Sequence, residues 1–396
     1  MSTLSSQGFA VAATAARASK LSDYYQPLGH GIINVAAHTG DMDLVLRREE
    51  GDESIRCRVS SQVMGSSSSY WRAMLDPGRG FKESLSHDEP VTVHDPNLLA
   101  VLLLLFVLHN RHDLVPEALA FRDLVDVCMA IDKYDCITPF KLWLRHWSTP
   151  WMLYVVHPGY EDWLCIAWVT GDEVTFKRLI KHLVYTCTIN DSGQCLTISK
   201  IEFKPDLPPE VDGTYPIHAN LLAYREADIC EIDFIIEARE TIFTGAMEAC
   251  QRHREGYTRT HAVAGGHWCT AMDSNIRVDC NYSHLGFFTD QLLQRRLLAG
   301  LGGNPADAAS TERSKNVTQL NQDIQGIRNY RTSDSPRSGR GGMSNYANAH
   351  SSCHSVSRLN GVVESLAARK IDEIVEYYRP HMNDQRQKLS QKPYST

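Results

Sequence analysis

The sequence has no hydrophobic run long enough to cross a membrane. Its most apolar run, Leu98–Leu108, has eleven residues, whereas a membrane-spanning helix needs about 20. This run therefore predicts a helix buried in a protein core. The chain also lacks the charged start and apolar segment of a secretory signal peptide. We expect an intracellular protein, cytoplasmic or nuclear, that has no membrane partner.

The chain also has no excess of positive charge, no dense cysteine framework and no recognisable catalytic motif. The 396 residues carry a net charge of −7, which argues against a nucleic-acid partner held by phosphate contacts. The eleven cysteines are widely spaced, as is typical of reduced thiols inside a cell. There is no G-x-x-x-x-G-K-[ST], no G-x-S-x-G and no H-E-x-x-H. These absences predict a protein that is not an enzyme and uses no cofactor.

The chain does contain enough apolar material for a packed core, since 43% of its residues are hydrophobic. Its patterning changes along the sequence and predicts six segments. They are a disordered arm (1–38), a strongly patterned block (39–150), a helical region (151–300), a flexible linker rich in Gly, Ser, Asn and Gln (301–357), an amphipathic helix (358–380) and a disordered tail (381–396).

The amphipathic helix near the C-terminus is expected to end at Pro380, because proline cannot donate the next helical hydrogen bond. A helix of this length is only marginally stable alone in water. It should therefore pack on the helical region of its own chain or on a partner.

The block 39–150 predicts an α+β fold. Ile55, Cys57 and Val59 alternate with arginines, as in a strand with one buried face. Ser60 or Ser61 can cap a helix that runs to Leu75. A short strand at 91–93, the apolar helix and a helix with a buried stripe over 121–131 follow. This order predicts a small sheet flanked by a cluster of helices.

Several short motifs follow one another along this block. They are Asp43-Leu44-Val45-Leu46, Arg58-Val59-Ser60-Ser61, Tyr70-Trp71-Arg72-Ala73-Met74-Leu75, Phe81-Lys82-Glu83-Ser84, the segment 91–95 and Asp132-Lys133-Tyr134-Asp135-Cys136. In this order they resemble the BTB/POZ domain, in the form found in fungal proteins, over residues 40–150. The segment 163–172 resembles the helical extension that follows such domains.

The resemblance implies a non-enzymatic protein–protein interaction protein that self-associates as a homodimer. In dimers of this family the N-terminal segment and the first helix form the contact, so we expect Asp43, Tyr70 and Trp71 at partner contacts. Ser60-Ser61 and Trp71 differ from the usual His-Lys and Phe of the family. The Lys helps to form a charged pocket in some dimeric members, and this chain lacks it.

An alternative within the same family is a substrate adaptor that binds the cullin scaffold of a ubiquitin ligase. A hydrophobic-x-Glu motif after the first helices contributes to that contact, and Phe81 and Glu83 match it. An aromatic anchor beside an acid suits an interface hot spot. Phe81 can equally pack under its own loop, with Glu83 in water.

A second alternative is a zinc-dependent structural or regulatory protein. Cysteine and histidine are the side chains that tetrahedral zinc prefers, and a group of them lies between residues 250 and 280. The weak metal candidates are Cys250, His253, His267, Cys269 and Cys280. Their spacing matches no standard zinc motif, so the competing interpretation is two packed thiols and a Gly-rich loop. Cys128 and Cys136 are interpreted as small core residues.

Overall fold

The computed structural model describes residues 20–25, 31–36, 38–48, 53–76, 78, 89–198, 231–258, 274–298, 314–328 and 356–390. These residues form an α+β structure with a small mixed sheet. The chain divides into two compact units. Unit 1 contains the described residues up to Leu179 and those from Val375 onward, and unit 2 contains those from Ile180 to Ile374. This division differs from the boundary expected at residue 150, because the helices that follow that residue begin within unit 1.

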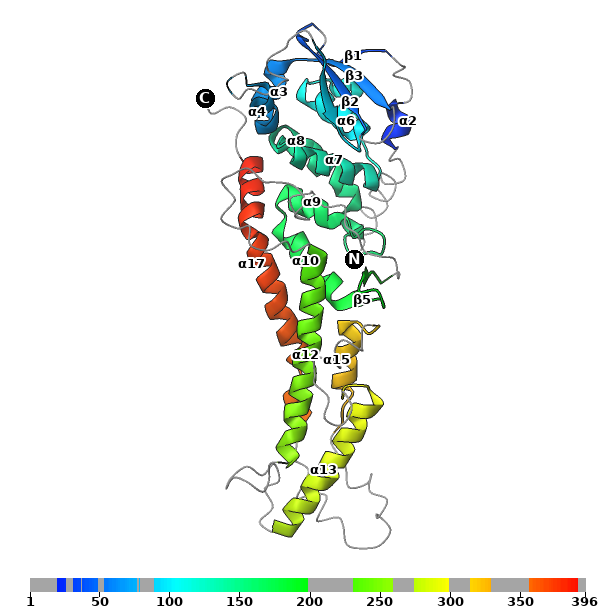
Figure 1. Ribbon diagram of the computed structural model, residues 1–396, viewed down its shortest axis with the longest axis vertical. Helices are drawn as coiled ribbons and strands as arrows, with labels where there is room; N and C mark the ends of the chain where they lie inside the picture. Colours follow the sequence, from blue (N-terminus) through cyan, green and yellow to red (C-terminus); the bar gives the residue numbers. More distant parts are fainter. Residues whose placement is uncertain are drawn as a thin grey trace, which may run out of the picture. The chain divides into compact units, whose positions relative to one another are not determined.

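The sheet of unit 1 has four strands in the order β1-β3-β2-β4. β2 and β3 form an antiparallel hairpin, β4 is parallel to β2, and the short β1 is parallel to β3. Leu44, Leu46, Cys57 and Val59 are completely buried, so the alternation in the sequence marks the face of the sheet that packs on the core. The strands are β1 (Ile33–Asn34), β2 (Met42–Arg47), β3 (Ser54–Val59) and β4 (Val91–His94) (Figure 1).

The apolar helix α6 (Leu98–Leu108) lies at the centre of unit 1 and packs against β2, β3 and neighbouring helices. Ten of its eleven residues are buried, and Leu99 is half-buried. A helix that is apolar on all sides is stable only when it is enclosed on all sides, so α6 is the core helix that the sequence predicts. No helix in the part of the chain that the structure describes is long and apolar enough to span a membrane.

Helices α2, α3, α7 and α8 pack against α6, and α9 packs against α7 (Figure 1). Two short 3-10 helices, His112–Leu114 and Thr149–Tyr154, connect them. The α-helices are α2 (Leu21–Tyr25), α3 (Ser61–Ser67), α4 (Ser69–Leu75), α7 (Phe121–Lys133), α8 (Ile137–Ser148), α9 (Trp163–Thr170) and the first part of α10 (Glu173–Thr186).

The helix expected from Ser60 to Leu75 is in fact two helices, α3 and α4. Ser68 separates them with an extended backbone, and its hydroxyl oxygen accepts a hydrogen bond from the Trp71 amide at 3.1 Å. The same hydroxyl donates to the Tyr134 carbonyl at 2.5 Å. Ser68 therefore caps α4 and also ties it to the end of α7, a contact that the local sequence pattern does not reveal.

The described part of the N-terminal segment is folded onto unit 1, which differs from the disordered arm expected over 1–38. Leu21 and Tyr25 of α2 are buried. The Tyr25 hydroxyl donates to the Leu114 carbonyl at 2.9 Å, and the Leu21 amide donates to Asp123 at 3.0 Å. β1 adds an edge strand to the sheet. Partners distant in the sequence hold this segment in place.

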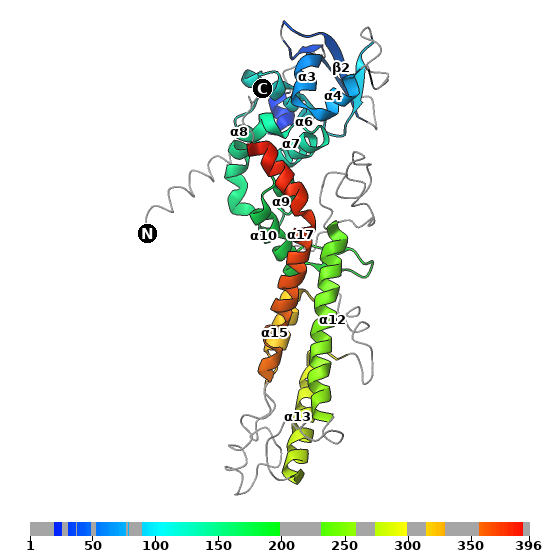
Figure 2. The ribbon, with the colours of Figure 1, turned by 90° about the vertical axis from the view of Figure 1, so that its left-hand side faces the viewer.

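Unit 2 combines long helices with a small hairpin. The hairpin adds strands to a region expected to be helical, and α15 falls within the linker expected over 301–357, where Val317 and Leu320 are completely buried. α12 and α13 pack against each other (Figure 2). The elements are β5 (Thr188–Ile189), β6 (Cys195–Leu196), α12 (Glu231–Thr258), α13 (Ser274–Gln294), α15 (Val317–Gln325), the 3-10 helix Val356–Leu359 and the first part of α17 (Val362–Ser390).

The last helix, α17, does not end at Pro380 but continues to Ser390. This corrects the expected stop and also the expected disorder of the described part of the tail. A proline inside a helix costs about 3 kcal/mol, so the residues after it must supply compensating contacts. Met382 is completely buried and Gln385 is 6% exposed. The part of α17 that belongs to unit 1 therefore packs on its own chain, as expected for a helix that is marginal alone.

Candidate interaction surface

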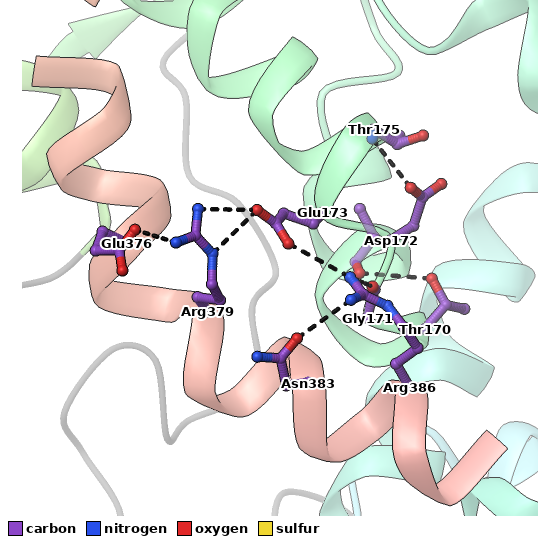
Figure 3. A network of polar contacts seen from close by, with 10 residues as sticks. Thr170, Gly171, Asp172, Glu173, Thr175, Glu376, Arg379, Asn383 and Arg386 are labelled. Atoms are coloured by element: carbon purple, nitrogen blue, oxygen red, sulfur yellow. Dashed lines mark hydrogen bonds and ion pairs between the residues drawn. The ribbon is translucent and has the colours of Figure 1, made fainter. Parts of the chain in front are cut away.

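A polar network of unit 1 joins the α9–α10 turn to α17 (Figure 3). Gly171 ends α9 in the left-handed conformation, with a φ of 64°. Asp172 follows it, and its carboxylate accepts a hydrogen bond from the Thr175 amide at 3.1 Å. This cap starts α10 and places Glu173 in the first helical turn. The turn thus directs one carboxylate toward α17.

Two arginines of α17 converge on that carboxylate, as Figure 3 shows. Arg379 approaches Glu173 with Nη2 at 3.1 Å and Nε at 3.2 Å from Oε1. Nη2 of Arg386 lies 3.0 Å from the Gly171 carbonyl oxygen and 3.5 Å from Oε2 of Glu173. Glu376 and Asn383 hold the two guanidinium groups from α17 itself. Glu173 therefore has two cationic partners on the same helix.

An aromatic cluster lies beside this polar network. The rings of Trp168 and His381 are stacked with their centroids 3.7 Å apart, and Tyr378 meets Trp168 edge-on at 5.2 Å. Burial is the main cause that lowers the pKa of His381 to about 4, and the charge of Lys388 adds to it. His381 is therefore neutral near pH 7 and packs as an aromatic side chain.

A second polar anchor connects α17 to the end of α7. The Gln385 amide donates to Asp132 at 3.2 Å, and the Lys388 ammonium lies 2.8 Å from Asp135. Asp135 also accepts a hydrogen bond from the Ser69 hydroxyl at the start of α4. The docked part of α17 is thus held at two places, and this arrangement serves to bind and position a helix.

The structure places the expected partner-binding residues in different environments. Trp71 is 1% exposed and stacks on Tyr134, with ring centroids 5.2 Å apart. It is a core residue and offers no surface to a partner, which corrects the expectation for it. Tyr70 is half-buried against both rings. Asp43 lies on β2, where it forms an ion pair with Arg58 at 2.9 Å and keeps a third of its side chain exposed.

Four of the other expected site residues lie outside the described residues. They are Phe81, Glu83, His267 and Cys269. The cullin contact therefore stays a prediction. Within the described residues no group of three or more His, Cys, Asp or Glu side chains could hold a metal ion.

The described metal candidates are packed into unit 2. Cys250 and Cys280 are buried on α12 and α13. His253 is 5% exposed, its Nε2 lies 3.1 Å from the Tyr257 hydroxyl, and its ring lies 4.9 Å from that of Phe288. Burial lowers the pKa of His253 to about 4. These contacts are those of a core histidine.

Sequence reasoning missed Glu173, Arg379 and Arg386. The two arginines are seven residues apart and share a helix face, which was a usable signal. However, a helix that ends at Pro380 includes Arg379 and excludes Arg386. The sequence also gives no reason to pair either arginine with Glu173, which is more than 200 positions away in the chain.

The fold and this surface define an α+β protein with a mixed four-stranded sheet, a helical cluster and a C-terminal helix docked through charged and aromatic contacts. Comparison of the chain with protein-family models, with curated proteins and with solved structures finds no match.

Proposed function

We propose that this protein is a non-enzymatic protein–protein interaction protein that acts through a BTB/POZ-like domain in unit 1 and forms a homodimer. The order of elements in unit 1 carries the proposal. A hairpin (β2–β3), a pair of short helices (α3–α4), a strand parallel to β2 (β4) and three further helices (α6, α7, α8) follow one another. The described motifs that resemble the family fall on these elements, in the same order.

The edge of the sheet supports a contact between two copies. β1 is an edge strand, and Ile32, directly before it, is 48% exposed. Arg111 donates to the Asn34 carbonyl at 3.0 Å, so this edge carbonyl is already bonded, and the proposed contact is made by the Ile32 side chain and not by strand pairing. Closed homodimers are the commonest oligomers, and an apolar side chain beside a sheet edge suits such an interface.

Sedimentation of the full-length protein tests this function. We expect a dimer at micromolar concentration. Ile32→Glu should weaken the dimer about 30-fold, since losing an apolar interface anchor costs about 2 kcal/mol. Ile198→Glu is the matched control, because Ile198 is 49% exposed but belongs to unit 2.

Two outcomes would count against the proposal. A monomer at tens of micromolar would exclude self-association. Equal weakening by the Ile32 and Ile198 variants would show that the sheet edge of unit 1 is not the contact.

A further inference from the structure

Two buried cysteines of unit 2 lie side by side at the β5–β6 hairpin. Cys187 follows the preceding helix, with its amide donating to the Leu183 carbonyl at 2.8 Å, and Cys195 begins β6. Ile189 pairs with Cys195 in the ladder. Cys187 lies two residues before Ile189, between the end of α10 and the start of β5. Each cysteine is 1% exposed, and the Cys187 thiol donates a hydrogen bond to the Cys195 sulfur.

A buried arginine acts on the same pair. Arg239 of α12 is 1% exposed, and its guanidinium lies 4.3 Å from the centre of the Phe243 ring. Its Nη2 donates to the Lys315 carbonyl at 2.6 Å, and its charge interacts with Cys195. A guanidinium stays protonated in a protein, and a buried cation is stabilised by a nearby anion. The thiolate form of Cys195 would be such an anion.

Other buried cysteines of the chain behave in the opposite way. Burial raises the pKa of the Cys57 and Cys250 thiols to about 12, and that of Cys128 and Cys136 also rises. The pKa of Cys195 is lowered although this thiol is buried too, because Cys187 donates a hydrogen bond and Arg239 supplies positive charge. Thiolate character is what makes a cysteine reactive.

We propose that Cys187 and Cys195 are a redox-active dithiol that hydrogen peroxide converts into a disulfide across the β5–β6 hairpin. The Cys195 thiolate attacks one peroxide oxygen, the O–O bond breaks, and the leaving hydroxide takes a proton to become water. Cys195 is then a sulfenic acid. The Cys187 sulfur attacks the Cys195 sulfur, the S–O bond breaks, and a second water leaves with the Cys187 proton. The two sulfurs are oxidised by two electrons in total, and the peroxide is reduced.

Residue-resolved oxidation of the full-length protein tests the proposal. The protein is treated with hydrogen peroxide, unfolded, alkylated and mapped by mass spectrometry, which also covers Cys230, Cys269 and Cys353. We expect Cys187 and Cys195 to lose alkylation together, before Cys57 and Cys250, and to appear as one disulfide-linked pair of peptides.

Two variants sharpen the test. Cys187→Ser should stop the reaction at a Cys195 sulfenic acid that a dimedone probe captures. Cys250→Ser, which removes a buried cysteine elsewhere in unit 2, should leave the disulfide unchanged. Oxidation of Cys195 no faster than that of Cys57, or a disulfide to any residue other than Cys187, would overturn the proposal.

Discussion

Gly171 is the position at which one added methyl group should separate the end of α17, residues 375–390, from the rest of unit 1. Its φ of 64° is a conformation that residues with a side chain rarely adopt. A Cβ atom there would collide with the Met382 carbonyl oxygen and lie 3.0 Å from the Arg386 amide nitrogen. Both are backbone atoms of α17, so no side-chain rotation relieves the contact. Gly171→Ala should therefore force the helix outward.

The expected loss has two parts. The left-handed conformation costs about 1–2 kcal/mol for a residue with a Cβ atom. Moving α17 outward also exposes part of Met382 and Tyr378, which are 0% and 7% exposed. Full burial of such a side chain contributes about 2 kcal/mol, so this part costs about 2–3 kcal/mol. The free energy of unfolding should fall by about 3–5 kcal/mol in all.

Gly159→Ala is the matched control. Gly159 also has a positive φ, 88°, but nothing lies within 4 Å of the position of its Cβ. It should lose only the conformational part, about 1–2 kcal/mol. Urea unfolding measures both variants, and limited proteolysis reports whether α17 is released. If the two variants lose the same stability and α17 stays protected, the close approach at Gly171 does not hold the helix.

Three further predictions concern the same unit. Trp71→Ala should destabilise the protein by about 3–5 kcal/mol in urea unfolding; unchanged stability with a lost dimer would mean that Trp71 is a contact residue after all. Glu173→Gln should lower the free energy of unfolding by about 1 kcal/mol, and by less at high salt, because its arginine partners are half-exposed. Glu248→Gln, in an exposed pair, should lower it by almost nothing. Equal melting temperatures for the two variants would contradict this. The pKa of His381 is about 4 in the folded protein against 6.5 as its ordinary value, so the unfolded chain takes up the proton first. The contribution of neutral His381 to stability should be complete above pH 6.5 and fall by about 1.4 kcal/mol per pH unit toward pH 4. His381→Phe should reduce this dependence of stability on pH in thermal melts across that range. An unchanged dependence would show that His381 is not the group that titrates.

Local patterns predicted much of unit 1. The alternation of Ile55, Cys57 and Val59 predicted β3, and the apolar run predicted α6, because each pattern reports which side of an element meets the core. The candidate sites were less predictable. Cys187 and Cys195 flank a turn, but the sequence does not indicate that the two thiols are neighbours or that Arg239 interacts with Cys195.

The amino-acid pattern is enough to specify the type and approximate position of the elements with a strong hydrophobic period. The helix break at Ser68 and the passage of α17 through Pro380 arise only in the folded chain. Ser68 is held by the Tyr134 carbonyl, 66 positions away, and the end of α17 by Asp132, 253 positions away from Gln385. A local pattern carries the preferences of neighbouring residues, whereas these outcomes depend on contacts between distant ones, whose free energy exceeds the local preference.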